Sequence, residues 1–142
     1  MTSSSSTFTH SIRIYWEDTD AGGIVFYANY LKFMERGRTE WLRSLGIEQQ
    51  RLRDEVGGMF VVSEANIKYL QPARLDDELV VTAQLQSAGR ASMAILQQVL
   101  LKPKQPTDTP VLLCEGTIRI GWVDAASMRP ARIPTTLIQT IS

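Results

Sequence analysis

Two aspartates and two glycines stand close together near the start of the chain, in the run Trp16-Glu-Asp-Thr-Asp-Ala-Gly-Gly-Ile-Val-Phe-Tyr-Ala-Asn-Tyr30. An alternating stretch precedes this run and a helical pattern follows it, so the run joins a strand to a helix. The first N–H groups of a helix are unpaired and lie at the positive end of its dipole, which suits a carbonyl or an oxyanion. Asp20 lies just upstream, where its carboxylate could act on the group that those N–H groups bind.

The residues at the beginning of this run and before it alternate between two faces of an extended chain. Ile12, Ile14 and Trp16 share one face, and the residues between them share the other. A two-residue period of this kind is typical of a half-buried strand. We therefore expect a strand over residues 11–17 that leads directly to the two acids.

The residues after the run follow a helical pattern. Apolar side chains recur at intervals of three and four over residues 30–45, which predicts one long helix with an apolar stripe. Asn29 is the expected N-cap, and Gly46 is the expected residue at the C-terminal cap. Gly37 is unfavourable in the middle of a helix, so we expect the backbone to approach another element closely there.

Most of the remaining chain is predicted to form strands. Runs rich in β-branched or alternating apolar residues predict strands over residues 59–69, 78–87, 91–102 and 111–123. Short helical segments are expected at 51–56 and 135–141. Because hairpin-length turns separate the later strands, the order implies an antiparallel sheet covered by one helix, in a single α+β domain over residues 11–142. Residues 1–10 form a Ser/Thr-rich tail that we expect to be flexible, with His10 inert in it.

Composition narrows the classes of function. The 142 residues are 44% hydrophobic, enough for one domain with a buried core. With 15 basic and 15 acidic residues the formal net charge is zero, so no overall field favours nucleic acid or an anionic membrane. A single cysteine, Cys114, which we expect in the core, and a single histidine provide neither a disulfide nor a zinc cluster. Without a signal peptide or an apolar run of membrane-spanning length, the chain is expected to be cytoplasmic.

Two stretches carry a resemblance to a known family. The run from Asp18 to Tyr30, followed by Phe33-Met-Glu-Arg-Gly-Arg-Thr-Glu40, resembles the signature of the hotdog-fold acyl-CoA thioesterases. It is most similar to the Tol-Pal-associated branch and more distantly similar to the 4-hydroxybenzoyl-CoA thioesterases. Similarity in Tyr69-Leu-Gln-Pro-Ala-Arg-Leu-Asp-Asp-Glu78 extends the resemblance to about residues 11–134. Many Tol-Pal-associated members have a histidine where this chain has Tyr27, and at that position the chain is similar to the hydroxybenzoyl-CoA enzymes.

The resemblance implies a fold, an activity and a set of site residues. The implied fold is a five-stranded antiparallel sheet wrapped around one long helix, in a homodimer or homotetramer whose copies join sheet edges and form active sites at the interface. The implied activity is hydrolysis of an acyl-CoA, or of an acyl-carrier protein thioester, without a metal and without a cofactor beyond the coenzyme A of the substrate. Asp20 is the implied catalytic carboxylate, as nucleophile or general base. The residues expected to bind the substrate and polarise its carbonyl are Gly22, Gly23, Ile24, Tyr27 and Ala28.

Several of these residues also have a structural interpretation. Asp20 could shape the turn before the helix by bonding to its own loop, as aspartates often do. Asp18 is expected to be structural, as an acceptor for nearby backbone N–H groups. Gly22 and Gly23 could simply turn the chain. Tyr27 could be either a core ring or a wall of the active site.

Two glutamates on the predicted helix and two other classes of function complete the alternatives. Glu35 and Glu40 could be catalytic, but their arginine-rich polar face favours solvated ion pairs. A dehydratase or hydratase of the same fold would need a histidine at the site, whereas His10 lies in the predicted tail. A non-catalytic acyl-carrier or envelope-complex binding protein would keep the fold without the reaction. An assay for release of the free thiol separates that class from a thioesterase.

Overall fold

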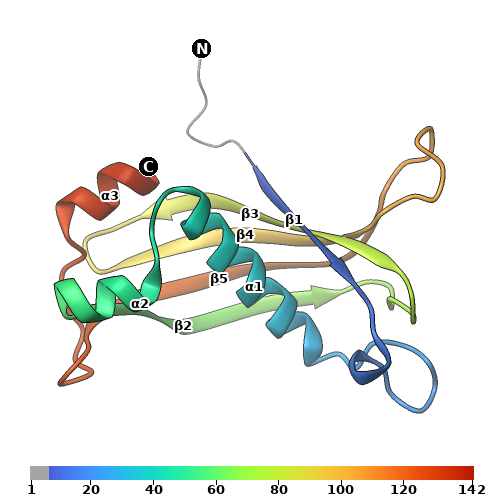
Figure 1. The fold of residues 1–142 in the computed structure, drawn as a ribbon, viewed down its shortest axis with the longest axis horizontal. Coiled ribbons are helices and arrows are strands. Elements are labelled where there is room, and N and C mark those ends of the chain that lie inside the picture. The colour runs from blue at the N-terminus through green and yellow to red at the C-terminus, as the bar shows by residue number, and fades with distance from the viewer. Residues whose placement is uncertain (1–6) are drawn as a thin grey trace.

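The computed structural model describes residues 7–142, which form one antiparallel sheet with a long helix on one face (Figure 1). The sheet order is β1-β3-β4-β5-β2, and every neighbouring pair is antiparallel. The strands are β1 (Phe8–Arg13), β2 (Gly58–Tyr69), β3 (Glu78–Ala88), β4 (Ser92–Leu101) and β5 (Val111–Asp124). The helical segments are α1 (Asn29–Ser44), α2 (Gln49–Arg51), a π-helical turn (Leu52–Val56) and α3 (Thr135–Ile141). The predicted α+β class and the five-stranded antiparallel sheet with its long helix are confirmed.

Strand β1 begins earlier than the pattern predicts. Phe8 lies opposite Ala83 and His10 lies opposite Val81 in the pairing with β3, so the strand starts within the stretch that we assigned to the tail. The predicted position of His10 in that tail is therefore wrong. Residues 1–6 of the predicted tail lie outside the described residues.

The end of β1 is also misplaced by the alternating pattern. The strand stops at Arg13, and Trp16 begins a short 3-10 turn in which its side chain is 77% exposed. The predicted place of Trp16 on the buried face is therefore wrong. Asp18 closes this turn, because its carboxylate accepts a hydrogen bond from the Tyr15 N–H at 2.9 Å. A bond between a side chain and the nearby backbone competes with the strand and leaves no trace in the hydrophobic period.

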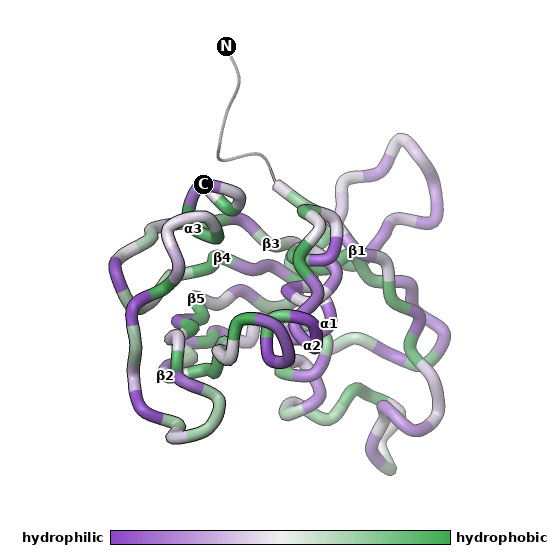
Figure 2. Tube along the Cα trace, turned by 60° about the vertical axis from the view of Figure 1, so that its left-hand side comes forward, coloured by the Kyte–Doolittle hydropathy of each residue, from purple (hydrophilic) through white to green (hydrophobic). Residues whose placement is uncertain are grey.

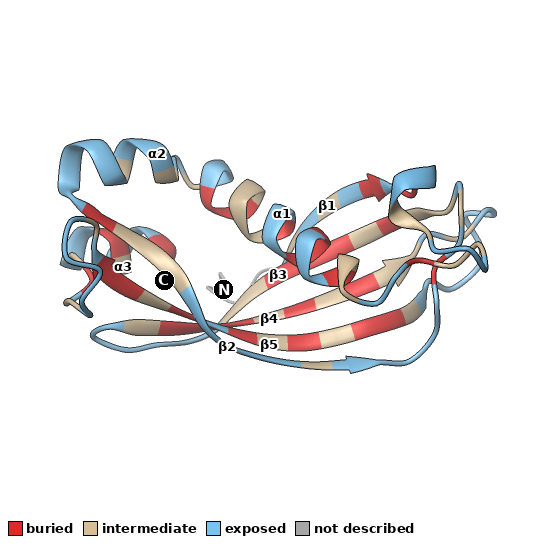
Figure 3. Cartoon of the chain, turned by 90° about the horizontal axis from the view of Figure 1, so that it is seen from below, coloured by how far each residue is buried: buried red, intermediate tan, exposed pale blue. Residues whose placement is uncertain are grey.

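Helix α1 covers the concave face of the sheet with its apolar side. Phe33 and Met34 are fully buried, and Leu42 is nearly so. Figure 3 shows the buried positions of α1 facing buried positions of the central strands. The hydrophobic effect therefore holds the helix on the sheet along most of its length.

The two predicted caps of α1 have different outcomes. Asn29 is the first helical residue rather than the N-cap, which is Ala28, and the Asn29 side chain donates to the Asp18 carbonyl at 2.8 Å instead of accepting from the helix. At the other end Gly46 donates to Arg43 O at 3.0 Å, and the following N–H donates to Leu42 O at 2.9 Å. These two bonds form the cap expected for a glycine after a helix.

The close approach predicted at Gly37 is present. A Cβ atom built on Gly37 would lie 2.8 Å from Val81 Cγ1 on β3 and 3.2 Å from Gln97 Nε2 on β4. Neither distance leaves room for a side chain, so the helix backbone itself contacts the sheet here. This contact sets the spacing between α1 and the two strands.

Buried and more exposed residues alternate on β5 as predicted. Figure 2 shows hydrophobic residues in green and hydrophilic residues in purple along the strands of the sheet. The predicted positions Cys114, Gly116, Ile118, Ile120 and Trp122 are all buried, and Leu113 and Val123 near the two ends of the strand are buried as well. Burial raises the pKa of the Cys114 thiol to about 11, as expected for a core cysteine. Strand β2, in contrast, pairs only with β5 among residues 7–142 and is exposed over much of its length (Figure 3). No helix within residues 7–142 is long and apolar enough to cross a membrane.

Candidate active site

The two glycines of the acidic run lie in a tight turn. Thr19 and Val25 face each other in an antiparallel bridge, and inside it the Asp20 N–H donates to Ile24 O at 2.8 Å. The turn is closed by Gly23, whose N–H donates to Asp20 O at 3.0 Å and whose φ is +80°. Glycine adopts this left-handed conformation without the steric cost that a Cβ would add. The predicted turn-forming role of Gly23 is therefore confirmed.

The Asp20 side chain is exposed beside this turn. Its Oδ1 accepts a hydrogen bond from the Gly22 N–H at 2.8 Å, which is the bond that the structural interpretation predicts. Oδ2 accepts no hydrogen bond from any other part of residues 7–142. One oxygen thus orients the carboxylate while the other is open to a water molecule or a substrate, so the structural and the chemical interpretations are compatible.

Asp18 is a structural acceptor, as predicted. Its carboxylate binds the Tyr15 N–H, and its carbonyl oxygen accepts bonds from the Phe26 N–H at 3.2 Å and from Asn29 Nδ2 at 2.8 Å. These bonds tie the turn before the glycines to the first residue of α1. The Asp20 turn and the start of the helix are therefore held together through Asp18.

Two backbone donors directly before α1 are unpaired within residues 7–142. The N–H groups of Asn29, Tyr30 and Leu31 donate to carbonyls three residues earlier, at 2.9, 3.3 and 3.2 Å. Among residues 7–142 no acceptor contacts the N–H groups of Tyr27 and Ala28. Unpaired N–H groups at a helix start are the donors that the chemistry of an oxyanion requires.

A hollow of about 290 Å³ opens next to these donors. Tyr27 is 63% exposed and forms part of its wall, so it is not a core ring. The Tyr69 ring meets Tyr27 edge-on with centroids 5.9 Å apart and meets Tyr30 at 5.7 Å. Burial raises the pKa of both Tyr30 and Tyr69, so these hydroxyls stay protonated near pH 7. The lining residues are Ile24, Val25, Tyr27, Tyr30, Tyr69, Leu70, Gln71 and Pro72.

The predicted site residues only partly coincide with this hollow. Ile24 and Tyr27 line it, whereas the other four predicted residues, Asp20, Gly22, Gly23 and Ala28, do not. The wall formed by residues 69–72 was not among the predicted site residues. The signal was available, because the resemblance already included the run that begins at Tyr69. Its position beside the helix start depends on sheet pairing and could not be derived from spacing.

The wall formed by residues 69–72 is joined through Ala73 to the loop that carries Asp18 and Asp20, residues 18–25, which we call the acidic loop. The Ala73 carbonyl accepts from the Val25 N–H at 2.9 Å, and its own N–H donates to the Tyr30 hydroxyl at 3.0 Å. Ile24 also forms a bridge with Arg74. Three segments that are distant in sequence therefore meet at one end of the sheet: the acidic loop, the start of α1 and the loop between β2 and β3.

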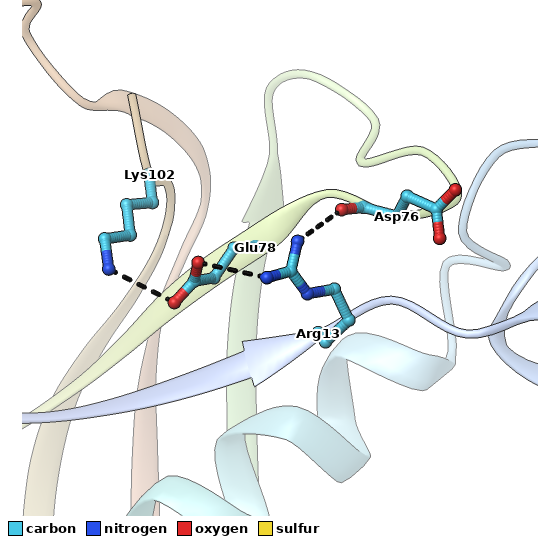
Figure 4. Close-up of polar contacts among 4 residues, drawn as sticks. All are labelled: Arg13, Asp76, Glu78 and Lys102. Atoms are coloured by element: carbon cyan, nitrogen blue, oxygen red, sulfur yellow. Dashed lines mark hydrogen bonds and ion pairs between the residues drawn. The ribbon is translucent and has the colours of Figure 1, made fainter. Parts of the chain in front are cut away.

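Polar and ionic contacts join the loop between β2 and β3 to the sheet where β3 begins (Figure 4). Arg13 at the end of β1 donates to the Asp76 carbonyl at 2.9 Å and to the Glu78 carboxylate at 3.3 Å. Lys102 donates to the other oxygen of Glu78 at 3.2 Å. All three charged side chains are partly exposed, so each pair adds little stability and the cluster serves mainly to hold the geometry.

The other candidate groups do not converge on the hollow. Glu40 pairs with Arg43, and Glu35 accepts from the Thr39 hydroxyl, so the ion-pair prediction holds for Glu40 and not for Glu35. Cys114 is fully buried, as predicted. Within residues 7–142 no group of three or more His, Cys, Asp and Glu side chains is arranged to hold a metal ion.

Comparison with known proteins identifies the family. The sequence pattern of the thioesterase superfamily matches residues 22–105. The chain belongs to the thioesterase superfamily. It is 37% identical over 127 residues to the acyl-CoA thioesterase YbgC of Haemophilus influenzae, a match that spans 89% of this chain and 88% of that protein. It is 36% identical over 131 residues to the acyl-CoA thioester hydrolase YbgC of Escherichia coli, with 92% of each chain covered.

A solved structure within the thioesterase superfamily agrees with the fold. The 4-hydroxybenzoyl-CoA thioesterase of Pseudomonas sp. strain CBS-3 superposes with a TM-score of 0.84, covering 94% of this chain and 98% of that one. At 20% sequence identity this similarity shows the fold alone. The predicted family, the hotdog fold and the class of thioester-hydrolysing enzymes are therefore confirmed.

The bond between Tyr30 and Ala73 can be tested by removing one hydroxyl. Tyr30→Phe should lower the free energy of unfolding by about 1–3 kcal/mol, because it leaves the fully buried Ala73 N–H without an acceptor. Urea unfolding measures the change. Tyr27→Phe is the matched control, since its exposed hydroxyl has no partner within residues 7–142, and it should change stability by less than about 0.5 kcal/mol. Equal losses in the two variants would contradict the assignment.

Proposed function

We propose that the chain hydrolyses acyl-CoA thioesters to a carboxylic acid and coenzyme A, with the Asp20 carboxylate and the N–H groups of Tyr27 and Ala28 as the reacting machinery. The observation that carries the proposal is the pair of unpaired N–H groups directly before α1, at Tyr27, which lines the hollow, and at Ala28, which follows it. The substrate class follows that of the relatives at 36–37% identity, which are named as acyl-CoA thioesterases. Acyl-carrier protein is the second possible carrier of the acyl group, and parallel assays with both carriers distinguish them.

The proposed chemistry needs one base or nucleophile and one oxyanion site. With Asp20 as general base, the carboxylate takes a proton from water and the resulting hydroxide attacks the thioester carbon. The carbonyl oxygen becomes an oxyanion that accepts hydrogen bonds from the two N–H groups, and the helix dipole adds to its stabilisation. The C–S bond then breaks, and the departing thiolate takes the proton from Asp20. With Asp20 as nucleophile, its oxygen attacks the carbonyl carbon, the C–S bond breaks, and the coenzyme A thiolate leaves and takes a proton from solvent. Water then hydrolyses the resulting mixed anhydride, which releases the acid and restores the Asp20 carboxylate.

The role of Asp20 is tested by a substitution that keeps its shape. Asp20→Asn retains an oxygen that can accept from the Gly22 N–H, so the turn should persist while the negative charge is lost. Turnover should fall by on the order of 10² or more, the usual scale for losing one acid–base group. Release of free thiol from an acyl-CoA measures turnover, and circular dichroism verifies folding.

Asp18→Asn is the matched control for this variant. The Asp18 side chain accepts one bond from the Tyr15 N–H, and an asparagine oxygen can accept the same bond. Turnover of Asp18→Asn should therefore stay near that of the unmodified protein. If Asp18→Asn abolishes turnover without unfolding and Asp20→Asn does not, the two assignments are reversed. If neither changes turnover, the carboxylate mechanism is wrong.

The proposal includes no metal and no cofactor beyond the coenzyme A of the substrate. Main-chain N–H groups supply the electrophile, so the carbonyl needs no Lewis acid. Activity should be unchanged after exhaustive treatment with EDTA. Turnover that is lost on chelation and restored by an added divalent ion would contradict this part of the proposal.

The proposal also includes a homodimer, or a homotetramer built from such dimers. Strand β2 is an edge strand that pairs with β5 alone, and Val62 on it is 51% exposed. An exposed edge invites pairing with another strand, and two copies related by a two-fold axis can cover both edges at once. Sedimentation should therefore give at least a dimer. A fully active monomer would contradict the proposed assembly.

A further inference from the structure

Gln97 is a polar side chain that lies fully buried between α1 and the sheet. Its Nε2 donates to the Met34 carbonyl on α1 at 2.9 Å and to the Thr82 carbonyl on β3 at 3.2 Å. Its Oε1 accepts from Arg38 Nη1 at 2.9 Å. The amide therefore forms three hydrogen bonds, two of them with α1, and a buried amide without partners would cost considerable free energy.

The position of Gln97 makes these bonds sensitive to the placement of α1. Met34 and Arg38 are one helical turn apart, and Gly37 lies between them against the sheet. A Cβ on Gly37 would come within 3.2 Å of Gln97 Nε2, so the helix backbone lies directly against the amide. A slide or rotation of α1 would break two bonds and leave buried polar atoms unpaired, whereas apolar contacts alone are non-directional and would tolerate a small shift.

The groups of the proposed reaction lie on two connected segments. The turn that carries Asp20 is bonded to the loop between β2 and β3, through the Val25 N–H and Ala73 O, and to the first residue of α1, through Asn29 and the Asp18 carbonyl. Tyr27 and Ala28, whose N–H groups are the proposed donors, directly precede α1. A shift of the helix on the sheet would therefore move these N–H groups relative to the carboxylate or break one of these bonds. Met34 follows Ala28 by six residues, or about 9 Å of rigid helix, so the position of α1 at Met34 is transmitted to its start.

We infer that Gln97 is a positioning residue for the hydrolysis, because its bonds to Met34 and Arg38 fix α1 on the sheet and so hold the oxyanion donors at the correct distance from Asp20. This inference rests on the proposed function. A displacement of about 1 Å in a reacting geometry can lower a rate by on the order of 10². Gln97 itself lines neither the hollow beside Tyr27 nor the acidic loop.

The central test replaces Gln97 with a side chain of similar length and no amide. Gln97→Met should lower kcat by about tenfold or more while KM changes by less than about threefold. The reason is that the misplaced donors meet the oxyanion only in the transition state, whereas the acyl-CoA binds mainly through other contacts. Assays run below the onset of thermal unfolding, with free thiol release as the readout. A variant that only destabilised the fold would instead leave the kcat of the folded fraction unchanged.

Thr82→Val is the matched control. The Thr82 hydroxyl is also buried and accepts a bond from the Gln98 N–H at 2.9 Å, but this bond joins two strands and does not involve α1. Its loss should lower the melting temperature and leave kcat within about twofold of the unmodified protein. The comparison separates a loss of stability from a loss of helix position.

A second variant keeps the test decisive if Gln97→Met does not fold. Arg38→Met removes one of the two bonds from Gln97 to α1 and retains the bond to Met34. Arg38 lines a hollow of about 140 Å³ and is only partly buried, so its replacement disturbs the packing less than replacement of the fully buried Gln97. It should lower kcat by about threefold or more with little change in KM.

The outcomes distinguish this inference from the proposed function. If Asp20→Asn is inactive while Gln97→Met and Arg38→Met keep normal kcat, the inference about Gln97 is overturned and the proposed function stands. Equal losses of kcat in Gln97→Met and Thr82→Val would also overturn it, because general destabilisation would then account for both. If the unmodified protein hydrolyses no acyl-CoA, the proposed function fails and this inference fails with it.

Discussion

The contact between the backbone of α1 and the sheet at Gly37 is the constraint on which the rest of the structure depends. One helix has to cover the concave face of five strands, and the missing side chain lets it approach Val81 and Gln97 directly. Phe33 and Met34 then fill the space on one side of this contact and Leu42 on the other. Because the interior is close-packed, the helix has little freedom to settle elsewhere.

The geometry of the candidate site follows from this position of α1 on the sheet. Once α1 is in place, its first turn lies beside the end of β2, and the Tyr30 hydroxyl reaches the Ala73 N–H. The acidic loop is bound from both sides, by Asn29 on the helix and by Ala73 on the neighbouring loop. None of these bonds is strong by itself, but together they leave Asp20 and the start of α1 only a narrow range of relative positions.

The sequence predicted the elements of this fold better than their junctions. Hydrophobic period is a property of each element alone, so α1 and the buried face of β5 were identified correctly. Trp16 was misplaced because the bond from the Tyr15 N–H to the Asp18 carboxylate ends the strand, and such a bond has no periodic signature. Tyr69 joins the site through sheet pairing, and Gln97 reads as an ordinary polar strand residue, so the role of each depends on contacts between distant segments.

The hollow beside Tyr27 is open to water on one side. Tyr27 is 63% exposed, and Leu31 and Leu70 are 45% and 49% exposed, so one chain leaves an apolar surface in water beside the N–H groups that we propose as oxyanion donors. Hydrogen bonds to an oxyanion are most effective where water is excluded, since solvent weakens them. Leu70 directly follows β2, the edge strand through which we propose that two copies pair. Pairing there would bring a second chain to this open side, so the same edge that drives assembly would also shield the reaction from water.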